Sequence, residues 1–212
     1  MVDTPEKLQD LVKKLAAAKV ISFDTETTST DQMRAELVGL SLAVEAEHGY
    51  YIPVGHQSGS GTQLDAETVL DTLRKPLTDP KIAKVGHNLK YDFVVLARYG
   101  LRVQPLVFDT MIAEFLTNPT SRNLGLKNLA WVRQNIPMTN IEDLIGRGKK
   151  QITMAQVPIE QAAAYAAADA QAVLRLMPEL EAELKEKNAK ALMAELERSE
   201  EHTSELQSRQ SI

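Results

Sequence analysis

The sequence contains no cysteine among its 212 residues. Disulfide bonds and thiolate metal ligands are therefore excluded, and we expect a cytoplasmic protein. No apolar run approaches the length of a membrane span, and no signal peptide opens the chain. We therefore expect no membrane partner.

Glycine and proline are also sparse, with 10 and 9 residues, while 43% of the chain is hydrophobic. This balance predicts one globular domain that is long enough to bury a core. The net charge of −5 shows no general excess of basic residues. A protein that coats duplex nucleic acid is typically basic, so any nucleic-acid contact here must be local or assisted by metal ions.

The last residues do not resemble part of this domain. Residues 198–208, RSEEHTSELQS, match the in-frame translation of a widely used sequencing adapter over a run that is too long for chance. We therefore predict that residues 198–212 are read-through and not native. Residues 1–197 are predicted to form one domain that is a fragment of a longer chain.

Hydrophobic periodicity predicts helices that alternate with short strands. The apolar runs 37–44 and 50–54 are expected to pair as an antiparallel hairpin. Pro178 is expected to break or kink a long helix, and residues 146–150, GRGKK, are expected to form a flexible basic loop. Helices are expected over 5–18, 65–77, 89–99, 110–116, 124–134 and 158–197, and strands over 20–26, 37–44, 50–54, 82–85 and 106–108. This order predicts an α/β fold with a mixed central sheet, antiparallel in its first three strands and flanked by helices.

Two carboxylates stand on the first predicted strand. Asp24 and Glu26 are two residues apart, so their side chains point to the same face of the strand. Exposed strands often carry such pairs, but Ile21 and Phe23 predict that this strand is buried. Buried like charges repel unless a cation lies between them, so the pair indicates a bound cation.

Two further acidic residues each have an alternative explanation. Asp169 follows Tyr165 by four residues in YAAAD, which is typical of a helix packed closely on a sheet or of an acid brought near the first strand. Asp92 lies at the start of a helix, where an acid also favours the helix dipole, and we interpret Asp109 as an N-cap. Asp92, Asp169 and the pair on the strand give four carboxylates, which two divalent ions would balance. Oxygen ligands favour Mg²⁺ or Mn²⁺.

Three stretches of the sequence, FDTETT, NLKYD and YAAAD, resemble the exonuclease motifs of the DEDD superfamily in its tyrosine-containing branch. The resemblance is to the 3'-5' proofreading exonuclease domain of bacterial DNA polymerase I, and it covers residues 4–184. It implies a ribonuclease H-like fold, two divalent ions, and removal of nucleoside 5'-monophosphates from single-stranded DNA 3' ends. A polymerase domain is expected elsewhere in the parent chain.

The resemblance also implies roles for individual residues. Asp24, Glu26 and Asp169 would hold one ion, and Asp24 would also reach a second ion held by Asp92. Tyr165 and Glu26 would orient the attacking water, since a phenol with a pKa of about 10 is a poor base at neutral pH. The implied catalytic residues are Asp24, Glu26, Asp92, Tyr165 and Asp169.

The substrate contacts are less sharply indicated. Asparagine and lysine suit phosphate and tyrosine can stack on a base, but Lys90 is equally explained as a surface charge, Tyr91 as core and His87 as structural. Thr30 stands where the family commonly has an apolar residue against the terminal base, so we expect weaker discrimination of frayed ends. The expected substrate-binding residues are Thr25, Thr30, His87, Asn88, Lys90 and Tyr91.

Two other functions stay open. A ribonuclease D-like exonuclease that trims RNA 3' ends would use the same catalytic set, because the metals act on the phosphodiester and not on the sugar. The KVGHNLKYD and GRGKK stretches favour the polymerase family over this alternative. A catalytically silent domain that supports a polymerase is disfavoured, because no acidic residue of the motifs is missing.

Overall fold

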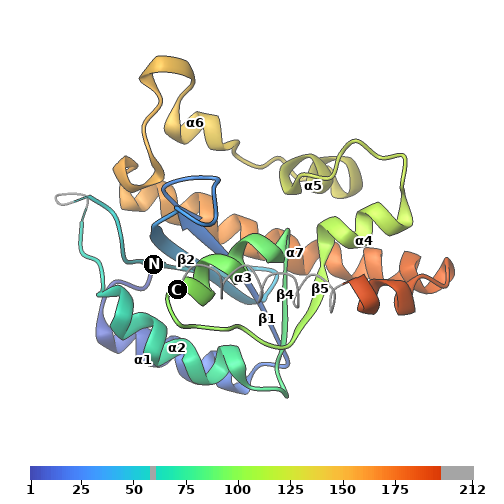
Figure 1. The fold of residues 1–212 in the computed structure, drawn as a ribbon, viewed down its shortest axis with the longest axis horizontal. Helices are drawn as coiled ribbons and strands as arrows, with labels where there is room; N and C mark the ends of the chain where they lie inside the picture. Colours follow the sequence, from blue (N-terminus) through green and yellow to red (C-terminus); the bar gives the residue numbers. More distant parts are fainter. Residues whose placement is uncertain (58–60, 197–212) are drawn as a thin grey trace.

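A five-stranded mixed sheet forms the centre of the fold, in the order β3-β2-β1-β4-β5 (Figure 1). The computed structural model describes residues 1–57 and 61–196. β1 pairs antiparallel with β2 and β2 with β3, while β4 and β5 add in parallel. The strands are β1 Val20–Thr27, β2 Leu37–Glu45, β3 His48–Pro53, β4 Ala83–Gly86 and β5 Leu106–Asp109. The predicted mixed sheet is confirmed, and the predicted read-through segment 198–212 lies outside the described residues.

Helices cover both faces of this sheet (Figure 1). α1, α2 and α3 pack against one face in a core that includes Ile21 and Phe23 of β1. α4, α5 and α7 pack together around Val85 of β4 and Phe108 of β5. The helices are α1 Pro5–Ala17, α2 Ala66–Thr78, α3 Leu89–Arg98, α4 Thr110–Thr117, α5 Leu126–Gln134, α6 Ile141–Ile145 and α7 Ile159–Glu186, with the 3-10 turns η1 Gly148–Lys150 and η2 Met154–Gln156. Within the described ranges, no helix is long and apolar enough to cross a membrane.

β1 divides its side chains between the two faces of the sheet. Ile21 and Phe23 enter the core beneath α1, α2 and α3. Because strand side chains alternate, Asp24 and Glu26 point to the opposite face, where they approach α7. The strand that buries apolar residues on one side therefore presents both carboxylates on the other.

α7 lies very close to the antiparallel part of the sheet. A Cβ atom added at Gly49 of β3 would lie only 2.4 Å from the carbonyl oxygen of Ala167. Ala162 and Ala166 of the same helix are buried against Val38 and Tyr51 of β2 and β3. Small side chains on both elements permit this approach, which brings the middle of α7 over β1.

Asp109 is an N-cap, as predicted, and it serves two helices. Its carboxylate accepts hydrogen bonds from the amides of Met111 and Ile112 in the first turn of α4. It also accepts from the amides of Asn88 at 3.0 Å and Leu89 at 2.7 Å, where α3 begins. The start of α3 is thus tied to the end of β5.

The C-terminal helix departs from its prediction. Pro178 was expected to break or kink this helix, and the break is wrong: α7 continues through Pro178, since the buried Leu176 and Leu180 hold both sides of it against the core. The helix stops before Asn188, whose φ of 55° is left-handed. α6 is absent from the prediction because five residues are too few to show a helical period, and η1 lies in the loop predicted at 146–150.

Candidate active site

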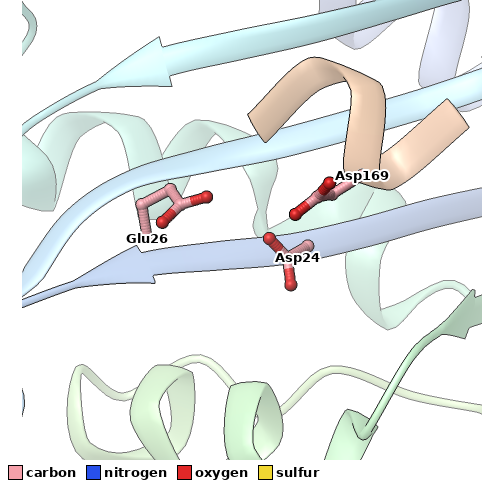
Figure 2. A group of neighbouring side chains, drawn as sticks. All are labelled: Asp24, Glu26 and Asp169. Carbon is pink, nitrogen blue, oxygen red and sulfur yellow. The ribbon is translucent and has the colours of Figure 1, made fainter. Parts of the chain in front are cut away.

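Three of the predicted metal-binding carboxylates converge on one point (Figure 2). Asp24 and Glu26 extend from one face of β1, and Asp169 reaches them from α7. One oxygen from each side chain lies within 4.8 Å of the other two. Glu26 and Asp169 are each only 7% exposed, so the cluster is largely withdrawn from water.

Burial makes the charges of this cluster unfavourable unless a cation is present. It raises the pKa of Glu26 well above its ordinary value, and repulsion from Asp24 adds to the shift. Burial also raises the pKa of Asp24 to about 6, against the attraction of Lys127. A cation bound between these carboxylates would therefore stabilise their charged forms.

Asp92 is fixed beside the three-carboxylate cluster and not within it. It is 2% exposed, and its Oδ1 atom accepts hydrogen bonds from the Thr25 amide at 2.8 Å and the Thr25 hydroxyl at 2.5 Å. Burial and then repulsion from Asp24 raise the pKa of Asp92, while the bonds from Thr25 lower it. Thr25, a predicted substrate residue, thus uses its hydroxyl group to hold Asp92.

Tyr165 lies one turn before Asp169 on α7 and takes part in the same site. Its side chain packs at the edge of the apolar cluster that contains Met154 and Val157. Burial raises the pKa of Tyr165, and repulsion from Glu26 adds to the shift. The phenol is therefore neutral at physiological pH, which suits a hydrogen-bonding role better than that of a base.

Lys127 belongs to the site, and it is not among the residues predicted from the sequence. Its ammonium group contacts Oδ1 of Asp169 and lies 4.0 Å from the centroid of the Tyr165 ring. Burial lowers the pKa of Lys127 to about 8, while attraction to Asp24 and Glu26 opposes the shift. No motif marks this residue, because its position depends on how α5 packs against α7. A basic residue in the first turn of a helix, where the helix dipole disfavours it, is the one available signal.

The acidic cluster opens into a cleft of about 840 Å³. Residues of α3, of the loop that follows β1, and of the segment from α6 to η2 line it. Lys90, on the first turn of α3, is not part of the lining. The predicted substrate residues that line the cleft are Thr25, Thr30, His87, Asn88 and Tyr91.

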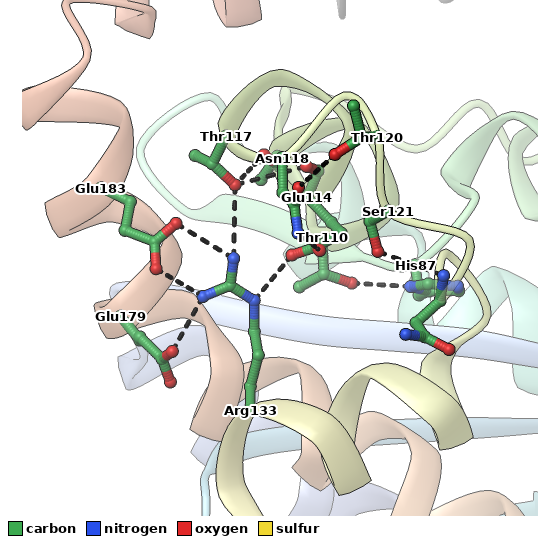
Figure 3. Close-up of polar contacts among 12 residues, drawn as sticks. His87, Thr110, Glu114, Thr117, Asn118, Thr120, Ser121, Arg133, Glu179 and Glu183 are labelled. Atoms are coloured by element: carbon green, nitrogen blue, oxygen red, sulfur yellow. Dashed lines mark hydrogen bonds and ion pairs between the residues drawn. The ribbon is translucent and has the colours of Figure 1, made fainter.

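Two of these residues also have partners within the protein. His87 Nδ1 lies 2.8 Å from the Thr110 hydroxyl (Figure 3), and burial lowers the pKa of His87 to about 4, so its ring is neutral. The Tyr91 hydroxyl contacts Thr27 and donates to the carbonyl oxygen of Ser29, which fastens the loop after β1. These contacts give both residues a structural role beside the predicted one.

The donor set fits hard divalent cations. Every ligand atom offered by Asp24, Glu26, Asp92 and Asp169 is a carboxylate oxygen, which suits Mg²⁺ and Mn²⁺. Repulsion from Asp24 raises the pKa of both Glu26 and Asp92, and all three carboxylates line the same cleft. An acidic cluster that opens into a cleft can hold metal ions against the phosphate of a bound chain.

Comparison with known families agrees with this chemistry. The family model described as 3'-5' exonuclease matches residues 1–185. The chain belongs to this exonuclease family. It is 46% identical over 179 residues to DNA polymerase I of Chloroflexus aurantiacus and 40% identical over 168 residues to DNA polymerase I of Pseudomonas aeruginosa. The alignments cover 84% and 78% of this chain, whereas the chain spans only 18% of the length of each polymerase. The predicted 3'-5' exonuclease family is therefore confirmed.

Solved structures share the fold. Escherichia coli RNase D superposes with a TM-score of 0.73 at 22% identity, over 96% of this chain and 50% of that protein. Brucella melitensis NrnC with bound Mg²⁺ superposes with a TM-score of 0.68 at 23% identity, over 89% of this chain and 85% of that one. At these identities the likeness shows the fold, and the predicted ribonuclease H-like α/β architecture is confirmed.

Proposed function

We propose that this exonuclease domain removes nucleoside 5'-monophosphates from the 3' ends of single-stranded DNA, and that it is the proofreading part of a longer DNA polymerase I chain. One observation carries the proposal: oxygens of Asp24, Glu26 and Asp169 lie within 4.8 Å of one another in a cleft that Asp92 also lines. The similarity to two DNA polymerase I chains supports the choice of DNA and the expected polymerase domain.

The acidic residues are proposed to hold two ions, either Mg²⁺ or Mn²⁺. Asp24, Glu26 and Asp169 would hold the first, and Asp24 and Asp92 the second. When bound, such a pair supplies the Lewis-acid chemistry of in-line phosphodiester hydrolysis by activating water and stabilising the leaving 3'-oxygen.

Other residues of the chain are proposed to position the reactants. Tyr165 keeps its proton, because burial and nearby carboxylates raise its pKa, so it orients the attacking water by a hydrogen bond and does not accept the proton. Asn88 is exposed in the cleft and is free to meet the substrate backbone with its amide group. Thr25 acts through Asp92, and Tyr91 through the loop that carries Thr30.

Degradation of 5'-labelled single-stranded DNA and RNA of one sequence, in Mg²⁺, tests the proposal. The parent chain should shorten DNA stepwise from the 3' end and release nucleoside 5'-monophosphates, detected by chromatography. Asp24→Ala should lose activity by about a thousandfold or more, because it removes a ligand of both ions. Asp71→Ala, at an exposed carboxylate of α2, is the matched control and should retain activity.

Two outcomes would contradict the proposal. Activity that survives Asp24→Ala would show that the acidic cluster does not catalyse the reaction. A strong preference for RNA would favour the ribonuclease D-like alternative, which uses the same catalytic residues.

A further inference from the structure

We propose that Lys127 is a resident cation of the metal site, which neutralises the acidic cluster when divalent ions are absent and competes with them for Asp169. The inference rests on the proposed function, because it concerns the ions that the exonuclease would use. It adds a residue from outside the three motifs to the site. It also means that the cluster binds metal ions less tightly than its carboxylates alone would allow.

The contacts of Lys127 place its charge inside the cluster. The ammonium group contacts Asp169 and lies over the Tyr165 ring, 4.0 Å from its centroid. Only 19% of the Lys127 side chain is exposed, and 9% of the Asp169 side chain. An ammonium group that has lost most of its water needs such partners, and a carboxylate together with an aromatic face supplies them.

The remaining acids of the cluster also attract this ammonium group. Both Asp24 and Glu26 interact favourably with Lys127 across the site. These are the carboxylates that converge with Asp169 to within 4.8 Å. The positive charge of Lys127 therefore partly neutralises the same three carboxylates that would bind the first ion.

Lys127 is presented by a helix that is anchored on both sides (Figure 3). Arg133, also on α5, bonds to Glu114 of α4 at 2.6 Å and to Glu179 and Glu183 of α7 at 2.8 and 2.6 Å. The Arg133 side chain is 10% exposed, so these ion pairs are partly shielded from solvent. Because α5 is tied to α7, the Lys127 side chain is held next to Asp169 and is not a freely moving surface group.

Divalent ions and this ammonium group cannot keep the same partners. An ion bound to Asp169 would repel the positive charge of Lys127 at contact distance in a poorly solvated site. The flexible four-carbon stem of lysine allows the head group to withdraw while α5 stays in place. The first ion, which would bind Asp169, must therefore displace Lys127 from this residue, and the displacement weakens metal binding.

Measurement of Mn²⁺ affinity without DNA, by calorimetry or by the paramagnetic resonance of free Mn²⁺, tests the inference. Lys127→Met should lower the Mn²⁺ dissociation constant by about tenfold, since the competing cation is gone. Lys127→Arg keeps a cation and should stay within about threefold of the parent. Lys75→Met, at an exposed lysine of α2, removes the same charge far from the cleft and should also match the parent.

An unchanged or raised dissociation constant in folded Lys127→Met would overturn the inference and leave Lys127 as a structural ion pair. Circular dichroism in EDTA establishes folding, and Lys127→Gln replaces the Met variant if that one does not fold. If the parent chain itself binds no Mn²⁺, the result contradicts the proposed function as well as the competition between Lys127 and the ions. The two failures are therefore distinguishable.

Discussion

Asp24 carries a charge that the folded chain disfavours when no metal ion is bound. Its pKa rises from an ordinary value of 3.8 to about 6 because the group is buried. Between about pH 4 and pH 6 the unfolded chain loses this proton while the folded chain retains it. The free energy of unfolding therefore falls as the pH rises through this window, and the loss is complete above about pH 6.

Asp24→Asn does not titrate, so its stability relative to the parent should depend on pH. In EDTA the variant and the parent should be similar near pH 4. Above about pH 6 the variant should be the more stable by on the order of 1–3 kcal/mol. Urea unfolding from pH 4.5 to 8 measures the difference, with Asp71→Asn as the exposed control. A difference that does not change with pH would show that Asp24 titrates normally.

Thr30 offers a test of how the terminal base is held. It lines the cleft beside the acidic cluster, and its short polar side chain gives a base little apolar surface to pack on. Thr30→Leu should therefore raise the preference for mismatched over matched primer ends by about fivefold, the scale of one added apolar contact. Hydrolysis rates on the two primers measure this ratio, and Thr120→Leu, an exposed position, is the control. Equal ratios for the parent and Thr30→Leu would contradict the expectation.

The acids of the site are predictable from sequence, and Lys127 is not. Asp24 and Glu26 share a strand, so the two-residue period alone places them on one face. Asp169 and Tyr165 share a helix face for a similar local reason. The contact between Lys127 and Asp169 instead depends on the packing of α5 on α7, which no local spacing encodes.

At the scale of elements, α4, α5 and α7 are joined by one guanidinium group. Arg133 pairs with Glu114, which is 3% exposed, and with Glu179 and Glu183. Removal of the arginine would leave the buried carboxylate of Glu114 without its charged partner, and this costs more than the loss of an exposed ion pair. These ion pairs hold α5 against α4 and α7.

Arg133→Met should lower the free energy of unfolding by about 3–5 kcal/mol, because the buried carboxylate of Glu114 loses its charged partner. Arg175→Met, at an exposed position of α7, is the control and should change stability by less than about 1 kcal/mol. Urea unfolding at pH 7 measures both variants. A small loss for Arg133→Met would mean that apolar packing alone holds α5.

Element boundaries were predictable where a local signal exists. The helix predicted over 5–18 and the strand predicted over 20–26 differ from α1 and β1 by one residue at one end, because capping and β-branched residues mark them. The end of α7 was not predictable from Pro178, since a proline inside a long helix is tolerated when the turns around it are packed. The left-handed Asn188 marks the true stop, but asparagine is common in other settings too.

At the scale of the whole molecule, three buried apolar clusters connect all layers of the described chain. We propose that residues 1–197 fold as one unit, which in the parent protein adjoins a polymerase domain. A chain that ends at residue 197 should unfold in a single transition, within about 2 °C of the melting temperature of the full sequence. Calorimetry measures the melting temperatures of both chains. A much lower melting temperature after removal of residues 198–212 would contradict the read-through interpretation.

The double cap at Asp109 has a consequence for how the site can be dissected. Its carboxylate secures the start of α3, and Asp92 lies on the first turns of that helix. Asp24, Glu26 and Asp169 depend on β1 and α7 instead. Asp109→Ala should therefore loosen one ion position and spare the other, so that calorimetry finds one strongly bound Mn²⁺ in place of two. Retention of both would show that α3 keeps its register without the cap. The proposed position of the second ion thus depends on Asp109, a residue that would bind neither ion.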